Sequence, residues 1–129
     1  MAYAVGVDLG TAYSAAATYR DGVTEMVSLG HRSTLVPSAV FLTAEGDFLI
    51  GDAALRRGST EPERLVREFK RRIGDSAPIL VGGSPLSAEA VAARLLRWIV
   101  DQVAEQQGEE ADRIGLTYPA NWGLFKQER

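Results

Sequence analysis

The sequence contains no cysteine, and this excludes disulfide bonds and thiolate metal sites. It also has no long hydrophobic run, because charged and polar residues interrupt every apolar stretch well before it could span a bilayer. The N-terminus lacks the basic region and the apolar core of a secretory signal. A chain with none of these features suits a reducing compartment, so we expect a cytoplasmic protein.

The sequence also lacks a strong excess of charge of either sign. Lys and Arg number 14 against 17 Asp and Glu, which leaves a net charge of −3. A dedicated nucleic-acid surface needs a basic face, and this balance argues against such a partner. The 129 residues contain no internal repeat and no low-complexity segment, and their length suits one domain or a piece of a larger one.

The most informative stretch is residues 5–14, which read Val-Gly-Val-Asp-Leu-Gly-Thr-Ala-Tyr-Ser. A short apolar run ends at an acid, a glycine and a hydroxyl residue follow, and apolar alternation then resumes. This pattern predicts strands over 2–8 and 14–20, joined by a tight turn over 10–13.

The residues of this turn suit an anion. Gly10 lets main-chain N–H groups approach a ligand closely, and successive N–H groups form a concave anion site. The Thr11 hydroxyl can add a hydrogen bond to a phosphate oxygen. Asp8 would repel a bare phosphate, so its position indicates a divalent cation between them, held through water. Asp and Gly are also common in ordinary hairpin turns, and the turn alone leaves both interpretations open.

Short strands and helices alternate along the rest of the chain, which predicts an α/β fold. Asp21-Gly22 predicts a hairpin that leads into a third strand over 23–29. Further extended segments are expected over 36–42, 48–50, 79–81 and 114–118.

Helices are expected in four places. The first opens at Gly51 with Asp52 as its N-cap. The second begins at Pro62 and ends at Gly74, and its apolar stripe consists of Leu65, Val66, Phe69 and Ile73. The clearest helix covers 87–107, and its stripe consists of Val91, Leu95, Trp98, Ile99 and Val103. Residues 120–129 begin a last helical segment, and its incompleteness suggests a truncated chain.

Five blocks of the sequence resemble seventy-kilodalton heat-shock chaperones (DnaK-like proteins), which belong to the superfamily of actin and the sugar kinases. The stretch over 5–14 resembles the family's first phosphate motif. The other blocks are Val-Pro-Ser-Ala-Val at 36–40, Ile-Gly-Asp-Ala-Ala at 50–54, Lys-Arg-Arg-Ile-Gly at 70–74 and Thr-Tyr-Pro-Ala at 117–120. One block alone would be weak, whereas five in the same order make the resemblance specific.

The resemblance implies an actin-like (ribonuclease H-like) ATPase lobe with a mixed sheet and helices, into which a small α+β subdomain is inserted. Residues 1–38 and 113–129 would form the first, incomplete part of the lobe, and 39–112 the inserted subdomain. The implied cofactors are ATP or ADP with Mg²⁺. Unfolded client peptides and co-chaperones would be partners of the parent protein, whose second phosphate hairpin and peptide-binding domain would follow this stretch.

Roles in the turn follow from the resemblance position by position. The peptide groups around Gly10, Thr11 and Ala12, together with Tyr13, would cradle the β- and γ-phosphates of ATP. Asp8 would orient waters around Mg²⁺. Ala12 replaces the second threonine that is common in the family, so one hydroxyl is lost while the backbone N–H remains. We therefore expect a weaker or altered phosphate contact.

Two basic residues receive roles in the same way. Lys70 would be catalytic, because it would reach the γ-phosphate and the attacking water, and Arg71 would stack on the adenine ring. Without the resemblance, the crowding of Arg67, Lys70, Arg71 and Arg72 would indicate a solvated surface.

Several functional alternatives remain open. The chain could belong to another actin-like protein, either a small-molecule kinase or a filament or scaffold protein, or it could be a pseudo-ATPase that serves as an interaction module. For the leading interpretation, half of the nucleotide cleft is missing, so we expect weak ATP binding and negligible hydrolysis. An apolar sheet face would also be uncovered, which predicts self-association.

Overall fold

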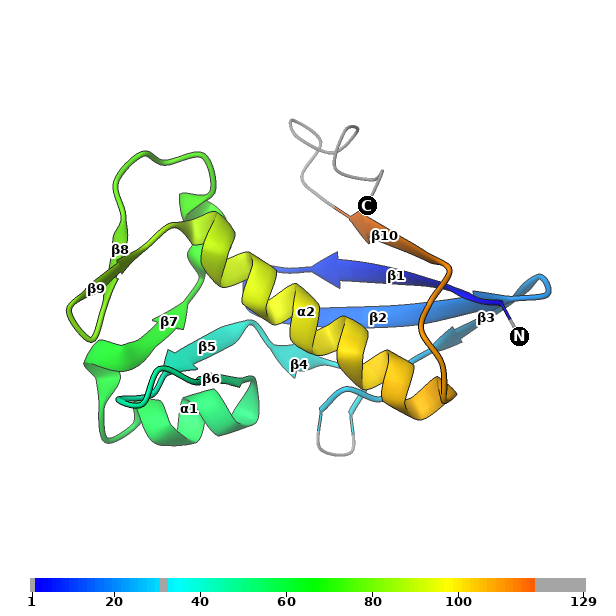
Figure 1. Ribbon diagram of the computed structural model, residues 1–129, viewed down its shortest axis with the longest axis horizontal. Helices are drawn as coiled ribbons and strands as arrows, with labels where there is room; N and C mark the ends of the chain where they lie inside the picture. The colour runs from blue at the N-terminus through cyan, green and yellow to red at the C-terminus, as the bar shows by residue number, and fades with distance from the viewer. Residues whose placement is uncertain (1, 31–32, 118–129) are drawn as a thin grey trace.

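The computed structural model describes residues 2–30 and 33–117. Two β-sheets form most of the fold, and the long helix α2 (Ala88–Gln107) packs on strands of both (Figure 1). This mixture of sheets and helices confirms the expected α/β class. The expected helical segment over 120–129, and the last residue of the expected strand over 114–118, lie outside the described residues.

The first sheet contains five strands, in the order β10-β1-β2-β3, with β4 also paired to β2. Their bounds are β1 (Ala4–Leu9), β2 (Tyr13–Arg20), β3 (Val23–Met26), β4 (Val36–Pro37) and β10 (Arg113–Thr117). β1 and β10 are parallel, whereas β2 is antiparallel to its partners β1, β3 and β4. The predicted strands at the start of the chain and both turns between them are confirmed.

The second sheet is smaller and has the order β6-β5-β7, formed by β5 (Ala39–Leu42), β6 (Phe48–Ile50) and β7 (Leu65–Arg67). The short helix α1 (Asp52–Gly58) covers one face of it, where Phe41 and Ala54 are fully buried. On the other face Val40, Ile50 and Val66 join the main core beneath α2. A separate hairpin pairs β8 (Ile79–Val81) with β9 (Ser84–Leu86).

Helix α2 holds the two sheets together. The predicted stripe is confirmed: Val91, Leu95, Ile99 and Val103 are fully buried in one cluster with strand residues of both sheets, and Trp98 is partly buried against that cluster. The predicted ends are confirmed as well: the Ala90 N–H donates to the Ser87 hydroxyl, and Gly108 ends the helix in the left-handed conformation.

The connector from α2 to β10 is fastened to the first sheet through Tyr3. The Tyr3 hydroxyl donates to the Glu109 carbonyl at 2.8 Å, and the Asp112 N–H donates to the Tyr3 carbonyl at 2.8 Å. Burial, followed by the nearby Glu110 carboxylate, raises the pKa of Tyr3 above its ordinary value. The neutral hydroxyl is therefore the form that the fold favours.

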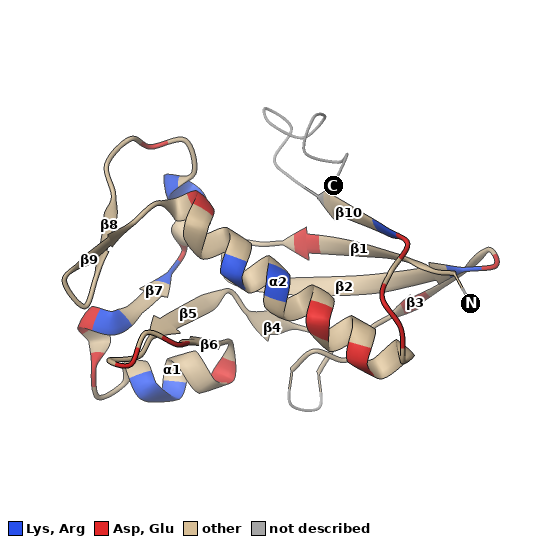
Figure 2. Ribbon diagram, viewed as in Figure 1, with Lys and Arg blue, Asp and Glu red and all other residues tan. Residues whose placement is uncertain are grey.

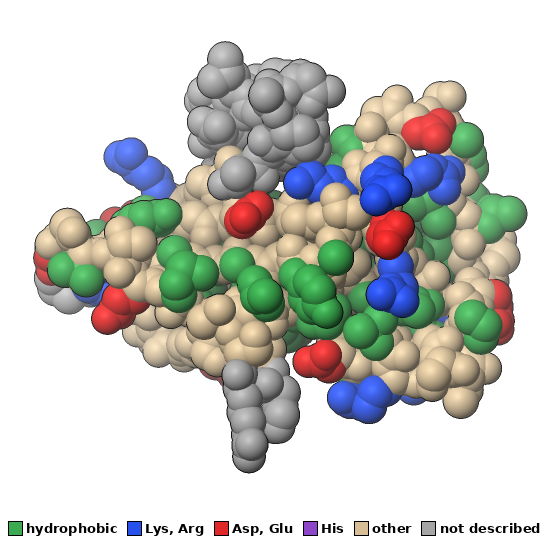
Figure 3. Space-filling model, turned by 180° about the vertical axis from the view of Figure 1, so that it is seen from behind, with side chains coloured by type: hydrophobic (Ala, Val, Ile, Leu, Met, Phe, Trp, Pro, Cys, Tyr) green, Lys and Arg blue, Asp and Glu red, His purple; other side chains and the backbone are tan. Residues whose placement is uncertain are grey.

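The other face of the first sheet, turned away from α2, is built from small and aromatic residues. Gly6 pairs with Gly115 there, and a Cβ placed on Gly6 would lie 3.0 Å from the Tyr19 ring. Tyr13, Tyr19 and Met26 are 56%, 47% and 58% exposed. Figure 3, seen from this side, shows a band of apolar side chains across the molecule. We call this surface the open face.

The prediction of a helix from Pro62 to Gly74 is wrong. Two 3₁₀ turns, η1 (Pro62–Arg64) and η2 (Phe69–Arg72), are separated there by β7. The strand forms because β5 pairs with it and because its side chains pack on opposite faces, with half-buried Leu65 toward α1 and buried Val66 toward the main core. Successive side chains of a strand point to opposite faces, whereas those of a helix do not.

Three smaller expectations also need correction. The N-cap of α1 is Gly51, with φ 70°, and Asp52 is the first helical residue, without a side-chain capping bond. The strand expected over 36–42 is two strands in different sheets, because the chain passes from β4 to β5 at Ser38. No strand is predicted over 84–86, yet β9 forms there as the partner of β8 and includes Pro85.

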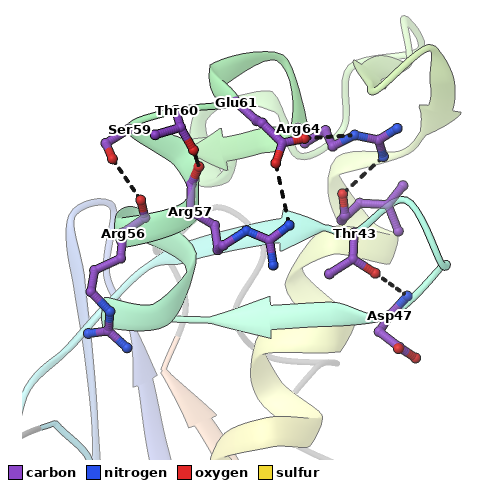
Figure 4. A network of polar contacts seen from close by, with 9 residues as sticks. Thr43, Asp47, Arg56, Arg57, Ser59, Thr60, Glu61 and Arg64 are labelled. Carbon is purple, nitrogen blue, oxygen red and sulfur yellow. Dashed lines mark hydrogen bonds and ion pairs between the residues drawn. The ribbon is translucent and has the colours of Figure 1, made fainter.

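A network of polar contacts lies at the end of the second sheet that carries the β5–β6 turn (Figure 4). Arg64 donates to the Leu42 carbonyl at 3.1 Å and lies 3.7 Å from Glu61, which also pairs with Arg57 at 3.4 Å. The Asp47 N–H donates to the Thr43 hydroxyl at 2.9 Å in the turn between β5 and β6. These contacts hold the end of α1, η1 and the β5–β6 turn together.

We propose that the domain division follows this architecture, with 1–38 and 113–129 in the first lobe and 39–112 in the insert. The change of sheet at Ser38 supports the first boundary. Helix α2 packs on both sheets, so the insert would share its core with the lobe.

Candidate functional site

The loop between β1 and β2 is held from one side by Ser38. The Ser38 N–H donates to the Ala12 carbonyl at 2.9 Å, and its hydroxyl donates to the Gly10 carbonyl at 2.8 Å. A further bond of 2.7 Å joins the hydroxyls of Ser38 and Ser14, both of which are buried. One residue therefore fixes two of the three carbonyls in the loop over 10–12.

These two bonds fix the direction of two amides. No described peptide bond is cis, and in a trans peptide the C=O and the following N–H point in opposite directions. Since the carbonyls of Gly10 and Ala12 point toward Ser38, the N–H groups of Thr11 and Tyr13 point away from it. Amides directed this way in a tight loop are compatible with the anion-binding concavity that the sequence predicts.

A small hollow of about 40 Å³ lies between this loop and the second sheet. Its lining consists of Thr11, Ala12, Tyr13, Pro37, Ser38, Ala39, Leu55, Arg67 and Glu68. Three of the predicted site residues therefore meet there. The volume is far below the roughly 300–1,000 Å³ of pockets that enclose a ligand, and the hollow lies on the Ser38 side of the loop, away from which the Thr11 and Tyr13 amides point.

Lys70 and Arg71 lie in η2, and neither is among the described residues that line the hollow. Their turn is placed by the buried Phe69 ring, which belongs to the main core, and η2 packs on α2. Lys70 is half-buried and follows Arg67, a lining residue, by three positions, which limits the distance between their Cα atoms to about 11 Å.

Arg72 and Asp75 hold the segment after η2. Arg72 donates to Asp75 at 3.3 Å, and the Ala77 N–H donates to the same carboxylate at 3.0 Å. The Ala77 hydrogen bond, followed by Arg72, lowers the pKa of Asp75. Arg72 is thus engaged in local structure, and this separates it from Lys70 and Arg71 in the basic run.

Asp8 lies on the open face, two residues before Gly10, with its side chain exposed. Its register partners are Ala15 on β2 and Thr117 on β10. Asp8 is not among the residues that line the hollow. A single exposed carboxylate suits an indirect contact to a hydrated cation better than a closed coordination site.

Sequence reasoning missed three residues of this region. Ser38 was noted only as part of a block, although a serine between two strands and next to a proline is a signal of local hydrogen bonding. Arg67 and Glu68 were assigned to a helix, and they reach the hollow because Arg67 pairs with Ala39 across β5 and β7.

A larger, shallow hollow of about 570 Å³ lies at the end of α2. Its lining consists of Asp101, Gln102, Ala104, Glu105, Gly108, Glu109 and Glu110. Figure 2 shows acidic residues along this part of α2 and its connector, whereas basic residues gather around α1, β7 and η2. A phosphate would be repelled at the acidic end, so size alone does not identify the site.

The hairpin, its loop and the mixed sheet are consistent with the expected actin-like ATPase lobe. A family model described as "Hsp70 protein" matches residues 4–80, so the chain belongs to the Hsp70 family. The resemblance seen in the sequence is confirmed.

Curated relatives agree with this assignment. The chain is 33% identical over 124 residues to the chaperone protein DnaK of Endomicrobium trichonymphae, covering 93% of this chain and 20% of the relative. It is 29% identical over 119 residues to the DnaK protein of Thermotoga petrophila, covering 92% of this chain and 20% of the relative. It is 30% identical over 124 residues to the DnaK protein of Cenarchaeum symbiosum, covering 93% of this chain and 19% of the relative. The chain thus spans about a fifth of the length of these relatives.

Proposed function

We propose that this chain supplies one side of an ATP or ADP site with Mg²⁺ in a DnaK-like chaperone. The peptide groups of the loop over 10–13 bind the β- and γ-phosphates, and Asp8 orients waters of the cation. Lys70 reaches the γ-phosphate and the attacking water, and Arg71 stacks on adenine. Phosphoryl transfer depends mainly on positioning and charge neutralisation, which is the chemistry that this set offers.

The observation that carries this proposal is the orientation of the Thr11 and Tyr13 amides away from Ser38. The distribution of charge supports it, since Arg67 lines the hollow beside the loop and Lys70 and Arg71 follow shortly after it. Glu68 also lines the hollow and opposes this field in part. A hydrated Mg²⁺ near Asp8 would complete the neutralisation of a bound polyphosphate.

We expect the chain by itself to bind ATP weakly and to hydrolyse it negligibly, because it presents one side of the site. Amide NMR titration with Mg·ADP should give saturable shifts at Thr11–Tyr13 only in the millimolar range, and calorimetry should detect no micromolar site. Micromolar affinity, or turnover that Lys70→Ala abolishes, would contradict the expectation. Absence of any response in the loop at saturating nucleotide would count against the nucleotide site itself.

Self-association through the open face is a second expected property. Tyr13, Tyr19 and Met26 expose apolar surface there beside small residues that allow close approach. Light scattering should show an average mass that rises with concentration, and Tyr19→Ser should reduce this rise. As a matched control, Leu80→Ser removes a 69% exposed apolar side chain from the β8–β9 hairpin and should leave the association unchanged. A constant monomeric mass at high concentration would refute the property.

For the parent protein we propose unfolded client peptides and co-chaperones as partners and the cytoplasm as its location; the relatives' name, chaperone protein DnaK, supports the chaperone role. Among the described residues, no helix combines the length and hydrophobicity needed to cross a membrane. Detection of client-stimulated ATP turnover in the parent protein would test the chaperone assignment against the kinase, scaffold and pseudo-ATPase alternatives.

A further inference from the structure

We propose that Ser38 and Ser14 form a buried positioning relay that holds the phosphate loop in its anion-binding orientation. The inference rests on the proposed function, and it adds two residues to which that function assigned no role. Ser38 is 3% exposed and Ser14 is 1% exposed, and both hydroxyls are engaged in hydrogen bonds within the protein. Both act through the loop backbone.

The relay has a defined direction. The Gly10 carbonyl can only accept, so the hydrogen atom of the Ser38 hydroxyl is used in the 2.8 Å bond to it. The 2.7 Å contact between the two serine hydroxyls must then be donated by Ser14 and accepted by Ser38. Ser14 therefore donates to Ser38, and Ser38 donates to the Gly10 carbonyl. Each donated hydrogen bond polarises the next.

The relay connects three elements at one point. Ser14 is the first buried residue of β2, Ser38 lies where the chain passes from β4 to β5, and Gly10 belongs to the loop. β2 and β4 also pair at this end, through Ser14 and Val36. The loop is therefore held to the junction of the two sheets, and the direction of the Thr11 amide depends on this anchor.

Loss of the Ser38 hydroxyl should let the Gly10–Thr11 peptide rotate, because its carbonyl would then seek water. The loop would have to be reordered each time an anion binds, so affinity would fall while the fold is kept. The backbone bond from Ser38 to the Ala12 carbonyl does not depend on the side chain, so the Tyr13 amide should keep its direction. The predicted effect is thus greater at Thr11 than at Tyr13.

Amide NMR titration of the chain with Mg·ADP tests the relay in three variants. Ser38→Ala should weaken binding by about three- to tenfold, the usual effect of one hydrogen bond, and should reduce the ligand-induced shift at Thr11 more than at Tyr13. Ser14→Ala keeps the Ser38–Gly10 bond and should weaken binding by only about twofold. Thr43→Val is the matched control, since it deletes a buried hydroxyl that accepts from the Asp47 N–H far from the loop. It should leave affinity unchanged.

The outcomes separate the relay from the nucleotide site. If the unmodified chain binds Mg·ADP and folded Ser38→Ala binds it equally well, the relay is wrong and the proposed function stands. If Thr43→Val weakens binding as much as Ser38→Ala, the effect is general destabilisation and the relay is wrong. If Ser38→Ala does not fold, Ser14→Ala decides, and unchanged affinity in that variant overturns the relay. No binding by the unmodified chain overturns the proposed function and the relay together.

Discussion

Leu95→Ala should lower the free energy of unfolding by about 2–5 kcal/mol, the range for removing a buried leucine and leaving a cavity. Leu95 is fully buried in the middle of α2, in one cluster with Val7 of the first sheet and Val66 of the second. A cavity there weakens the contacts of both sheets with the helix that joins them. Domains of ordinary stability have only about 5–15 kcal/mol in total, so this single change should remove a large share.

Urea denaturation followed by far-UV circular dichroism measures this change. Arg97→Ala is the matched control in the same helix, since its side chain is 73% exposed and pairs only at the surface with Asp101. It should change the free energy of unfolding by no more than about 0.5 kcal/mol. Equal urea midpoints for the two variants would show that packing of α2 against the sheets does not stabilise the core. If Leu95→Ala cannot be obtained folded, Ile99→Val should still cost about 0.5–1.5 kcal/mol.

The parts of the fold that the sequence predicts well are those that local pattern determines. Alternation around Asp21-Gly22 predicted the hairpin of β2 and β3, because both turn residues adopt the positive φ that such a turn requires. The 3.6-residue stripe and the cap at Ser87 gave α2 and its ends. In both cases the signal lies within a few residues of the structure that it specifies.

The error over 62–74 has the opposite origin. Leu65, Val66, Phe69 and Ile73 have helical spacing, yet the partner strand β5 lies more than twenty residues earlier and decides the conformation. Because pairing between distant segments leaves no mark on local periodicity, the strand could not be predicted. The same pairing brings Arg67 to the hollow, so the error in the fold also hid a site residue.

In the candidate site as well, local features could be predicted from the sequence and contacts between distant residues could not. The loop over 10–13 was predicted from its residue types, since a glycine and a hydroxyl residue after a strand have direct consequences for backbone conformation. The anchor at Ser38 was not, because its partners Gly10 and Ser14 lie 28 and 24 positions earlier. The roles of Asp8, of the loop over 10–13, and of Lys70 and Arg71 toward a nucleotide all remain predictions. The turn that carries Lys70 is placed by Phe69 in the core.

Gly10→Ala should abolish measurable nucleotide binding. A Cβ at this position would lie 2.2 Å from the Tyr13 carbonyl oxygen, a backbone atom that cannot move without opening the loop. Opening it moves the Gly10 carbonyl away from Ser38 and misdirects the Thr11 amide. We expect at least about a tenfold loss of affinity for Mg·ADP, together with a stability loss of about 1–3 kcal/mol typical of overpacking.

Gly115→Ala is the matched control for this change. Gly115 lies in the same sheet on β10, and among the described residues no atom outside its chain neighbours is within 4 Å of a Cβ placed there. Alanine in a strand should be neutral or should stabilise the fold by about 0.5–1 kcal/mol relative to glycine. Amide NMR titration and thermal unfolding of the two variants separate the alternatives. A Gly10→Ala chain that binds Mg·ADP like Gly115→Ala would show that the loop is an ordinary hairpin turn. Loss of binding in Gly10→Ala alone would show that nucleotide affinity depends on the close approach of backbone that only glycine allows.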